Sequence, residues 1–336
     1  MSNTLESALG EGNATMHINR SSRGFALGDV VFKWLALFFA FVVLLVLAGI
    51  IFMLIKGSIP AFEAFGFGFI TNDEWDPVNE VYGAWSALVG TLVAAAIAML
   101  IGLPLSFGIA IFITEMAPQW LKRPVGTAIE LLAAVPSIIY GMWGLFFFAP
   151  WFAAHVQPLL VSTLGTLPLI GALFQMPLIG GASGVSVLTA GIVLAIMIVP
   201  FMASVMRDVF EIVPGVLKES AYGIGATTWE VVWNVVLPYT KTGVVGGVML
   251  GLGRAIGETM AVTFIIGNAS QLGVSLLEPG STIAAKLANE FNEADGLQMD
   301  SLIAMGLILF IITFVVLMLS KLMLMRLAAT QEGSKT

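Results

Sequence analysis

Arg254 and Glu258 are charged residues inside an apolar stretch, a position that favours a functional role for a charge. On a helix over 242–267 they lie four residues apart, and therefore on the same face. Arg254 is then twelve residues into the helix, about 18 Å along it and near the middle of a membrane. Ionised groups at that depth cost roughly 3 kcal/mol each on insertion scales, so they usually face a protein interior or a wet cavity.

Two interpretations of this pair stay open. One is an internally neutralised pair that fastens the helix to a neighbour. The other is a site on the path of an anion, because the planar donors of an Arg suit phosphate or sulfate. In the second case Glu258 would keep Arg254 from trapping the anion too tightly, and it could accept a proton from a partly protonated oxyanion.

The composition places the pair in a membrane protein. Of 336 residues, 58% are hydrophobic and 10% are charged, and the mean hydropathy is +0.98. A soluble domain usually carries about 25% charged residues, so lipid must be the main solvent of this chain. The absence of Cys excludes disulfides, Cys-ligated metals and thiol nucleophiles, and two distant His residues disfavour a histidine metal site. We expect no metal and no cofactor.

Six segments are long and apolar enough to span a bilayer, which needs roughly 20 such residues. The sequence predicts an all-α, polytopic membrane helix bundle with six transmembrane helices over about 30–55, 84–113, 125–150, 186–206, 242–267 and 300–320. The first is too long for a signal peptide and is expected to be retained. Pro104, Pro136 and Pro200 are expected to break or kink their spans. The domains are a flexible N-terminal tail (1–28), the six-span domain (29–326) and a C-terminal tail (327–336).

The Lys and Arg residues predict the orientation. With both termini in the cytoplasm, eleven of them lie inside and two, Lys56 and Lys286, lie outside. The external loops 56–83 and 268–299 are acidic, and they are interpreted either as solvated caps or as a docking surface for a soluble partner. The external segment 151–185 is rich in Pro and Gly, and we expect it to dip back toward the membrane surface.

Glycines at 243, 247 and 251, and again at 253 and 257, recur every four residues around the charged pair. Such GxxxG patterns let helices approach closely, so packing is their expected role.

The loop 207–241, expected in the cytoplasm, predicts two short helices. Pro214 suits the first turn of one helix, and Gly223 and Gly225 supply a break. Thr227 and Glu230 fit a capping box that opens a second helix, which Pro238 is expected to stop.

This loop resembles the EAA loop of permeases in bacterial ABC importers. The matching residues are Glu219, Ala221, Gly225, Leu237 and Pro238, while Ser220 and Val235 depart mildly from the pattern. The resemblance implies that the first short helix fits a groove in a separate ATPase subunit and transmits its closure. No phosphate-binding GxxxxGK[ST] loop occurs in the chain, so ATP hydrolysis is expected in a partner subunit.

Two further stretches resemble the signatures of phosphate-specific (Pst) permeases of the C type. They are 253–262, which contains Arg254, Glu258 and Thr259, and 129–141, and with the EAA loop they extend the resemblance over 30–325. The resemblance implies a type I ABC importer permease in the bacterial inner membrane, with Arg254, Glu258 and Thr259 on the phosphate pathway. Glu130 is a weaker candidate, interpreted mainly as a polar anchor.

The implied partners are a second permease, ATP-binding subunits, an extracytoplasmic phosphate-binding protein, inorganic phosphate and lipid, without nucleic acid. The alternatives are a proton-coupled secondary anion transporter and a permease for another oxyanion, sulfate or molybdate. A membrane-embedded enzyme is disfavoured, because it would need a nucleophile, metal-binding carboxylates or His residues clustered at one membrane face, and the sequence shows no such cluster.

Overall fold

The computed structural model describes residues 23–168, 170–176, 183–271 and 273–332. The chain divides into two units, Met1–Met53 and Leu54–Thr336. Helix α1 (Arg23–Phe65) begins in the first unit and ends in the second. It starts before the predicted tail boundary at 28, because the apolar residues that follow Arg23 already continue the helix; the rest of that tail, 1–22, lies outside the described residues.

The described part of the second unit is mainly helical. In chain order its further elements are α2 (Gly68–Thr71), β1 (Trp75–Asp76), β2 (Val81–Tyr82), α3 (Trp85–Ile111), η1 (Phe112–Met116), α4 (Gln119–Ala133), α5 (Ser137–Trp143), η2 (Gly144–Phe148), α6 (Ala149–His155), α7 (Gln157–Thr163), η3 (Gly171–Phe174), α8 (Val187–Glu211), α9 (Gly215–Gly223), α10 (Thr228–Val231), η4 (Val232–Val236), α11 (Leu237–Ile256), α12 (Met260–Ile265), α13 (Ile283–Glu290) and α14 (Gly296–Glu332). Here η1, η2 and η4 are π-helical and η3 is a 3₁₀ helix. Helix α14 continues to Glu332, past the predicted tail boundary at 327.

Six stretches of the described residues are long and apolar enough to cross a membrane, as predicted. They are Gly28–Phe65, Trp85–Met116, Ser137–Thr163, Val187–Glu211, Thr228–Ile256 and Gly296–Leu322. The bounds of the third and fifth differ from the predicted 125–150 and 242–267. In the third, α4 ends at Ala133 and Pro136 caps a new helix, so the candidate span starts at Ser137.

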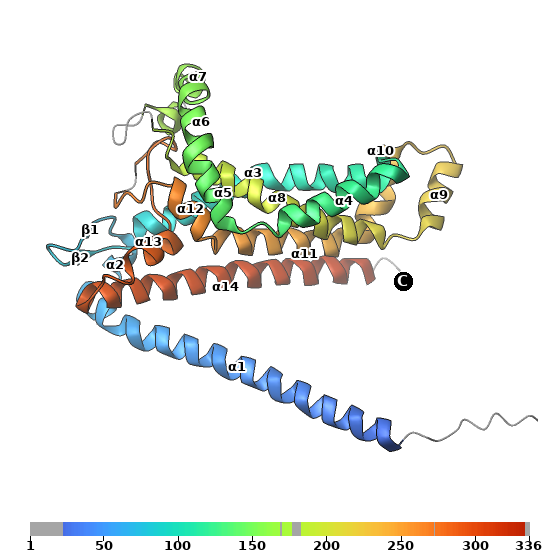
Figure 1. Cartoon of the computed structure of the whole chain (residues 1–336), viewed down its shortest axis with the longest axis horizontal. Helices are drawn as coiled ribbons and strands as arrows, with labels where there is room; N and C mark the ends of the chain where they lie inside the picture. Colours follow the sequence, from blue (N-terminus) through green and yellow to red (C-terminus); the bar gives the residue numbers. More distant parts are fainter. Residues whose placement is uncertain (1–22, 169, 177–182, 272, 333–336) are drawn as a thin grey trace, which may run out of the picture. The chain divides into compact units, whose positions relative to one another are not determined.

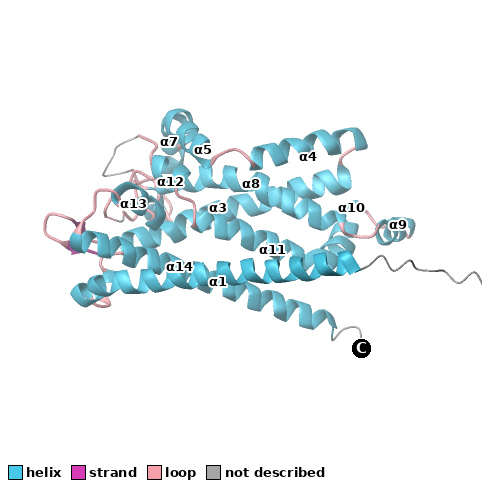
Figure 2. Ribbon diagram, turned by 60° about the horizontal axis from the view of Figure 1, so that its bottom comes forward, coloured by secondary structure: helices cyan, strands magenta, loops and turns pink. Residues whose placement is uncertain are grey.

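Helix α8 lies at the centre of the core. It packs along α3 and also contacts α4 and α11, and Figures 1 and 2 both show these helices side by side. The close approach depends on glycine: Gly102 of α3 lies against Ile198, and Gly191 of α8 lies against Ile97. Both α3 and α8 continue through Pro104 and Pro200, so neither proline breaks its helix. The Ser106 hydroxyl donates to the Val199 carbonyl at 3.2 Å across this interface.

The two ends of the second unit differ in structure. Figure 1 shows α9 and α10 at one end of the helix bundle, and the β1–β2 hairpin with α13 at the opposite end. The hairpin is antiparallel, with Trp75 opposite Tyr82. The loop predicted to be cytoplasmic and the acidic loops predicted to be external therefore lie at opposite ends of the bundle.

Candidate functional site

Helix α11 carries the predicted glycine face and presents it to α8. A β-carbon at Gly243 would lie 2.6 Å from Val209, one at Gly247 would lie 3.2 Å from Val205, and one at Gly251 would collide with Met202. The packing role expected of this GxxxG series is therefore confirmed, and α8 is the helix it packs against. Of the second series, Gly253 has Leu317 at 3.8 Å and Gly257 has only its own helix nearby.

The fifth span is interrupted beside the charged pair. Helix α11 ends at Ile256 with Gly257 as its cap, and α12 starts at Met260. Arg254 lies in the last turn of α11, where a cation complements the helix dipole. The Glu258 carboxylate accepts a hydrogen bond from the Ala261 amide of α12 at 3.2 Å. Each charge thus stabilises the end of a different helix.

This geometry corrects the prediction of an Arg254–Glu258 pair on one continuous helix face. Gly257 ends the helix between them, and the free amides of α12 then attract the carboxylate. The candidate span Thr228–Ile256 ends two residues after Arg254, whose guanidinium lies against Phe201 near the middle of α8. Thr259 lies in the same interruption and donates to the Gly257 carbonyl at 3.3 Å.

Arg254 keeps its charge available. Its guanidinium carbon lies 5.2 Å from the centre of the Phe201 ring of α8, a cation–π contact. Among the described residues, Arg254 forms no ion pair with a carboxylate, and its side chain is partly exposed. A held but unneutralised guanidinium has the chemistry of an oxyanion contact.

The two stretches with signature-like sequences meet in space. Gly141 of α5 lies against α12, where an added β-carbon would be 3.0 Å from the Ala261 α-carbon and 3.0 Å from the Phe264 ring. Only glycine permits this backbone approach. The interruption that holds Glu258 and Thr259 is therefore supported by α5 through α12.

The loop between α8 and α11 has the predicted break. Helix α9 ends at Gly223, and Gly225 has φ +94°, a conformation that favours glycine. The capping box is present, with the Thr227 amide donating to Glu230 at 2.8 Å. Pro238, however, does not stop the second helix: α10 continues through the π-helical turn η4 into α11, whose second residue is Pro238.

Helix α9 exposes much of its surface. Glu219 and Ser220 are exposed and Ala221 is half-buried, while further along, Leu237 is half-buried and Pro238 is exposed. Large apolar side chains are exposed beside them, including Val216 at 71% and Ile224 at 89%. This surface suits a protein partner better than water.

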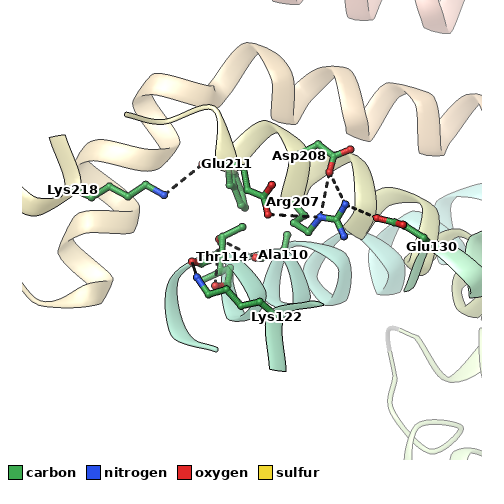
Figure 3. A network of polar contacts seen from close by, with 10 residues as sticks. Ala110, Thr114, Lys122, Glu130, Arg207, Asp208, Glu211 and Lys218 are labelled. Atoms are coloured by element: carbon green, nitrogen blue, oxygen red, sulfur yellow. Dashed lines mark hydrogen bonds and ion pairs between the residues drawn. The ribbon is translucent and has the colours of Figure 1, made fainter. Parts of the chain in front are cut away.

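Ion pairs join this end of the bundle together, as Figure 3 shows. Arg207 of α8 donates to Glu130 of α4 at 2.7 Å and to its neighbour Asp208 at 2.8 Å. Glu130 thus joins α4 to α8 through Arg207. Lys218 of α9 donates to Glu115 of η1 at 2.6 Å. Sequence reasoning did not identify Lys218 and Glu115, because they are 103 positions apart.

The opposite end holds a buried polar cluster between the two acidic loops. The Trp75 indole donates to Glu290 at 2.8 Å, and the Lys286 ammonium lies 3.0 Å from the same carboxylate and 4.4 Å from the Trp75 ring centre. Burial lowers the pKa of Lys286, and Glu290 partly opposes this shift. A cavity of about 790 Å³ lies beside the cluster, lined partly by Glu74, Asp76 and Glu278. No group of three or more His, Asp or Glu that could hold a metal ion occurs in the described residues.

The sequence and the fold both have known relatives. A family described as binding-protein-dependent transport system inner membrane component matches residues 102–328. The phosphate transport system permease protein PstC of Pasteurella multocida is 59% identical over 307 residues, which cover 91% of this chain and 94% of that protein. PstC of Haemophilus influenzae is 56% identical over 303 residues, covering 90% and 95%.

Among solved structures, a bacterial alginate ABC transporter in complex with an alginate-bound periplasmic protein has a chain of similar fold. The TM-score is 0.51 at 17% identity, covering 87% of this chain and 94% of that one, and the likeness concerns the fold alone. With six candidate spans, the protein is a multi-pass inner-membrane protein. The chain belongs to the family of binding-protein-dependent transport system inner membrane components, the permeases of ABC importers.

Proposed function

We propose that this chain is a transmembrane permease subunit of an ATP-driven phosphate importer. The observation that carries the proposal is the 59% identity, over 91% of the chain, with a protein named as a phosphate transport permease. The aligned region includes the coupling loop, the interrupted fifth span and the acidic loops, because the alignment covers nearly the whole chain.

The coupling loop provides the link to ATP. Helix α9 lies at one end of the bundle and exposes Val216 and Tyr222 beside Glu219, and Ile224, directly after the helix, is exposed as well. Apolar side chains around a carboxylate fit a groove on another protein, with the carboxylate free to pair with a cation there. We assign Glu219, Ser220, Ala221 and Gly225 to contact with an ATPase subunit, and Leu237 and Pro238 to the return into α11.

The interrupted fifth span provides the contact with phosphate. Arg254 has a cation–π contact but no carboxylate partner in the described part of the chain, so an oxyanion would give it one. Glu258 and Thr259 lie at the break, close in sequence to Arg254 but on the start of another helix. We assign the three residues to the phosphate pathway, which a second permease subunit completes and an extracytoplasmic phosphate-binding protein supplies.

Reconstitution tests the function. The chain is placed in proteoliposomes with its candidate second permease, ATPase and binding protein, and uptake of labelled phosphate, sulfate and molybdate is followed. We expect phosphate uptake that requires ATP and all partners. Uptake of phosphate without any ATPase would contradict the proposal and favour a secondary transporter, and preferential uptake of sulfate or molybdate would contradict the assigned cargo.

Variants of Arg254 test the site in the same assay. Arg254→Ala removes the anion contact and is expected to abolish uptake, while Arg254→Lys keeps the charge but loses the planar fork and is expected to retain part of it. Glu258→Gln keeps an acceptor for the Ala261 amide and removes the charge. Wild-type uptake by Arg254→Ala would refute the site, and wild-type uptake by Glu258→Gln would refute a proton-accepting role for Glu258.

A further inference from the structure

The side chain of Lys218 in α9 reaches two other helices of the bundle. The Lys218 ammonium donates to Glu115 at 2.6 Å and lies 3.5 Å from the Phe210 carbonyl. Glu115 belongs to η1, which prolongs α3, and Phe210 lies in the last turn of α8. Lys218 therefore joins α9 to the ends of both helices at once.

This ion pair is shielded from water, unlike the others at the same end. The Glu115 side chain is 5% exposed and that of Lys218 is 17% exposed. The three carboxylates around Arg207 are between 53% and 62% exposed. Exposed pairs are screened and contribute little, whereas a shielded pair resists separation because each charge would be left without a partner.

The two helices that Lys218 reaches, α3 with its extension η1 and α8, pack directly against each other. The Phe107 ring of α3 packs edge-on against the Phe210 ring of α8, with centroids 5.7 Å apart, and Phe210 is fully buried. On the α3 side, Lys122 donates to the Thr114 carbonyl at 2.6 Å and so holds the η1 segment next to Glu115. If α9 is displaced while Lys218 stays bound to Glu115, the packed ends of α3 and α8 must move with it.

The same pair of helices leads to the interrupted span. Helix α8 receives the glycine face of α11 at Val209, Val205 and Met202, and α11 ends two residues after Arg254. A continuous series of packed contacts thus connects α9 with Arg254 through α8. The π-helical turn of η1 fits this role, because widened turns often occur at functional positions in helices.

We propose that Lys218 and Glu115 are positioning residues that transmit movement of α9 to the α3–α8 pair. The proposal rests on the proposed function, in which an ATPase subunit moves α9. Without the ion pair, the ATPase still binds α9 and hydrolyses ATP, but the spans follow its movement less well. The quantity that changes is the amount of phosphate imported for each ATP hydrolysed.

The test measures this ratio in proteoliposomes that contain the complete importer. In Lys218→Met and Glu115→Gln we expect the ratio to fall by about 5-fold or more, the lower end of common coupling factors, with ATP hydrolysis retained. Glu211→Gln is the matched control. Its carboxylate lies at the same end of the bundle, but it is 62% exposed and its ion pair with Arg207 is long, at 3.9 Å. The reversed pair, Lys218→Glu with Glu115→Lys, is expected to recover most of the ratio.

A second measurement does not depend on the charge. The chain contains no Cys, so Lys218→Cys with Glu115→Cys can be joined by a short bis-maleimide. We expect a low ratio before linking and a recovered ratio afterwards. An unchanged ratio in both single variants overturns the proposal. The proposal is also overturned if neither the reversed pair nor the cross-linked cysteine pair restores the ratio, and a complex that fails to assemble counts as not restored. Failure of the proposed function differs, because then the wild-type complex itself shows no ATP-dependent uptake.

Discussion

The substitution Gly243→Ala tests whether the glycine face of α11 determines its packing on α8. A β-carbon at 243 would lie 2.6 and 2.9 Å from the two γ-carbons of Val209. Carbon atoms normally pack at about 3.5–4.0 Å, so a gap of about 1 Å must open between the helices. Val209 cannot rotate away, because a β-branched side chain in a helix has one strongly preferred rotamer.

The expected magnitude is a difference of two effects. Overpacking of a well-packed interface costs about 1–3 kcal/mol, and replacing a helical glycine with alanine gains about 0.5–1 kcal/mol. We expect Gly243→Ala to lower the free energy of unfolding by about 1–2 kcal/mol. Gly247→Ala, with a contact of 3.2 Å to Val205, should be nearly neutral. At Gly246 an added β-carbon meets no other part of the described residues within 4 Å beyond its own helix backbone, so Gly246→Ala should raise the free energy of unfolding.

The assay is unfolding of the purified chain in mixed micelles by increasing SDS, followed by circular dichroism. The three substitutions are the same Gly→Ala exchange within five positions of one helix, so they share the change in helix propensity, and Gly246→Ala is the matched control. Equal effects of Gly243→Ala and Gly246→Ala would refute the assignment of the glycine face to α8.

Two other regions give predictions. Lys286→Met should lower the free energy of unfolding by about 2–3 kcal/mol, because it leaves Glu290 with less compensation. Burial lowers the pKa of Lys286, so the folded state releases this proton before the unfolded state does, and stability should rise with pH from the folded pKa toward 10.5. That rise should vanish in Lys286→Met. Both proteins carry Tyr82→Phe, because burial raises the pKa of Tyr82, and its ionisation would make stability fall with pH above about 10. Gly225→Ala, at φ +94°, should impair uptake and lower the free energy of unfolding by about 1–3 kcal/mol. Gly223→Ala, at the end of α9, should leave both uptake and stability unchanged.

Local sequence patterns predicted the features that depend on neighbours along the chain. Long apolar runs defined six spans, and the Thr227–Glu230 spacing predicted the capping box. The recurrence of Gly243, Gly247 and Gly251 predicted a packing face. It did not identify α8 as the partner, because several apolar helices could fill the same groove and only the assembled bundle decides between them.

Features that depend on contacts across the bundle were mispredicted or missed. The pair at 254 and 258 fits a helix by spacing alone, and Gly257 does not by itself show that the helix ends there, because α11 contains several other glycines. In the structure Gly141 lets α5 lie directly on α12, and the Ala261 amide of α12 donates to the Glu258 carboxylate. The Lys218–Glu115 contact joins residues 103 positions apart, and the lysine alone resembles any other lysine predicted to lie on the cytoplasmic side.

The interruption of the fifth span explains how two opposite charges remain close in sequence without neutralising each other. On a continuous helix, Glu258 would lie one turn from Arg254, and the pair would have little charge left for a ligand. Separate helices give each charge its own compensation: the carbonyl end of α11 for Arg254 and the amide end of α12 for Glu258. Helix ends compensate a charge only partly, with about half an elementary charge each. Arg254 therefore stays stable at its position and still attracts an oxyanion, and because α8 packs against α11 along the glycine face, a shift of α8 changes where that attraction acts.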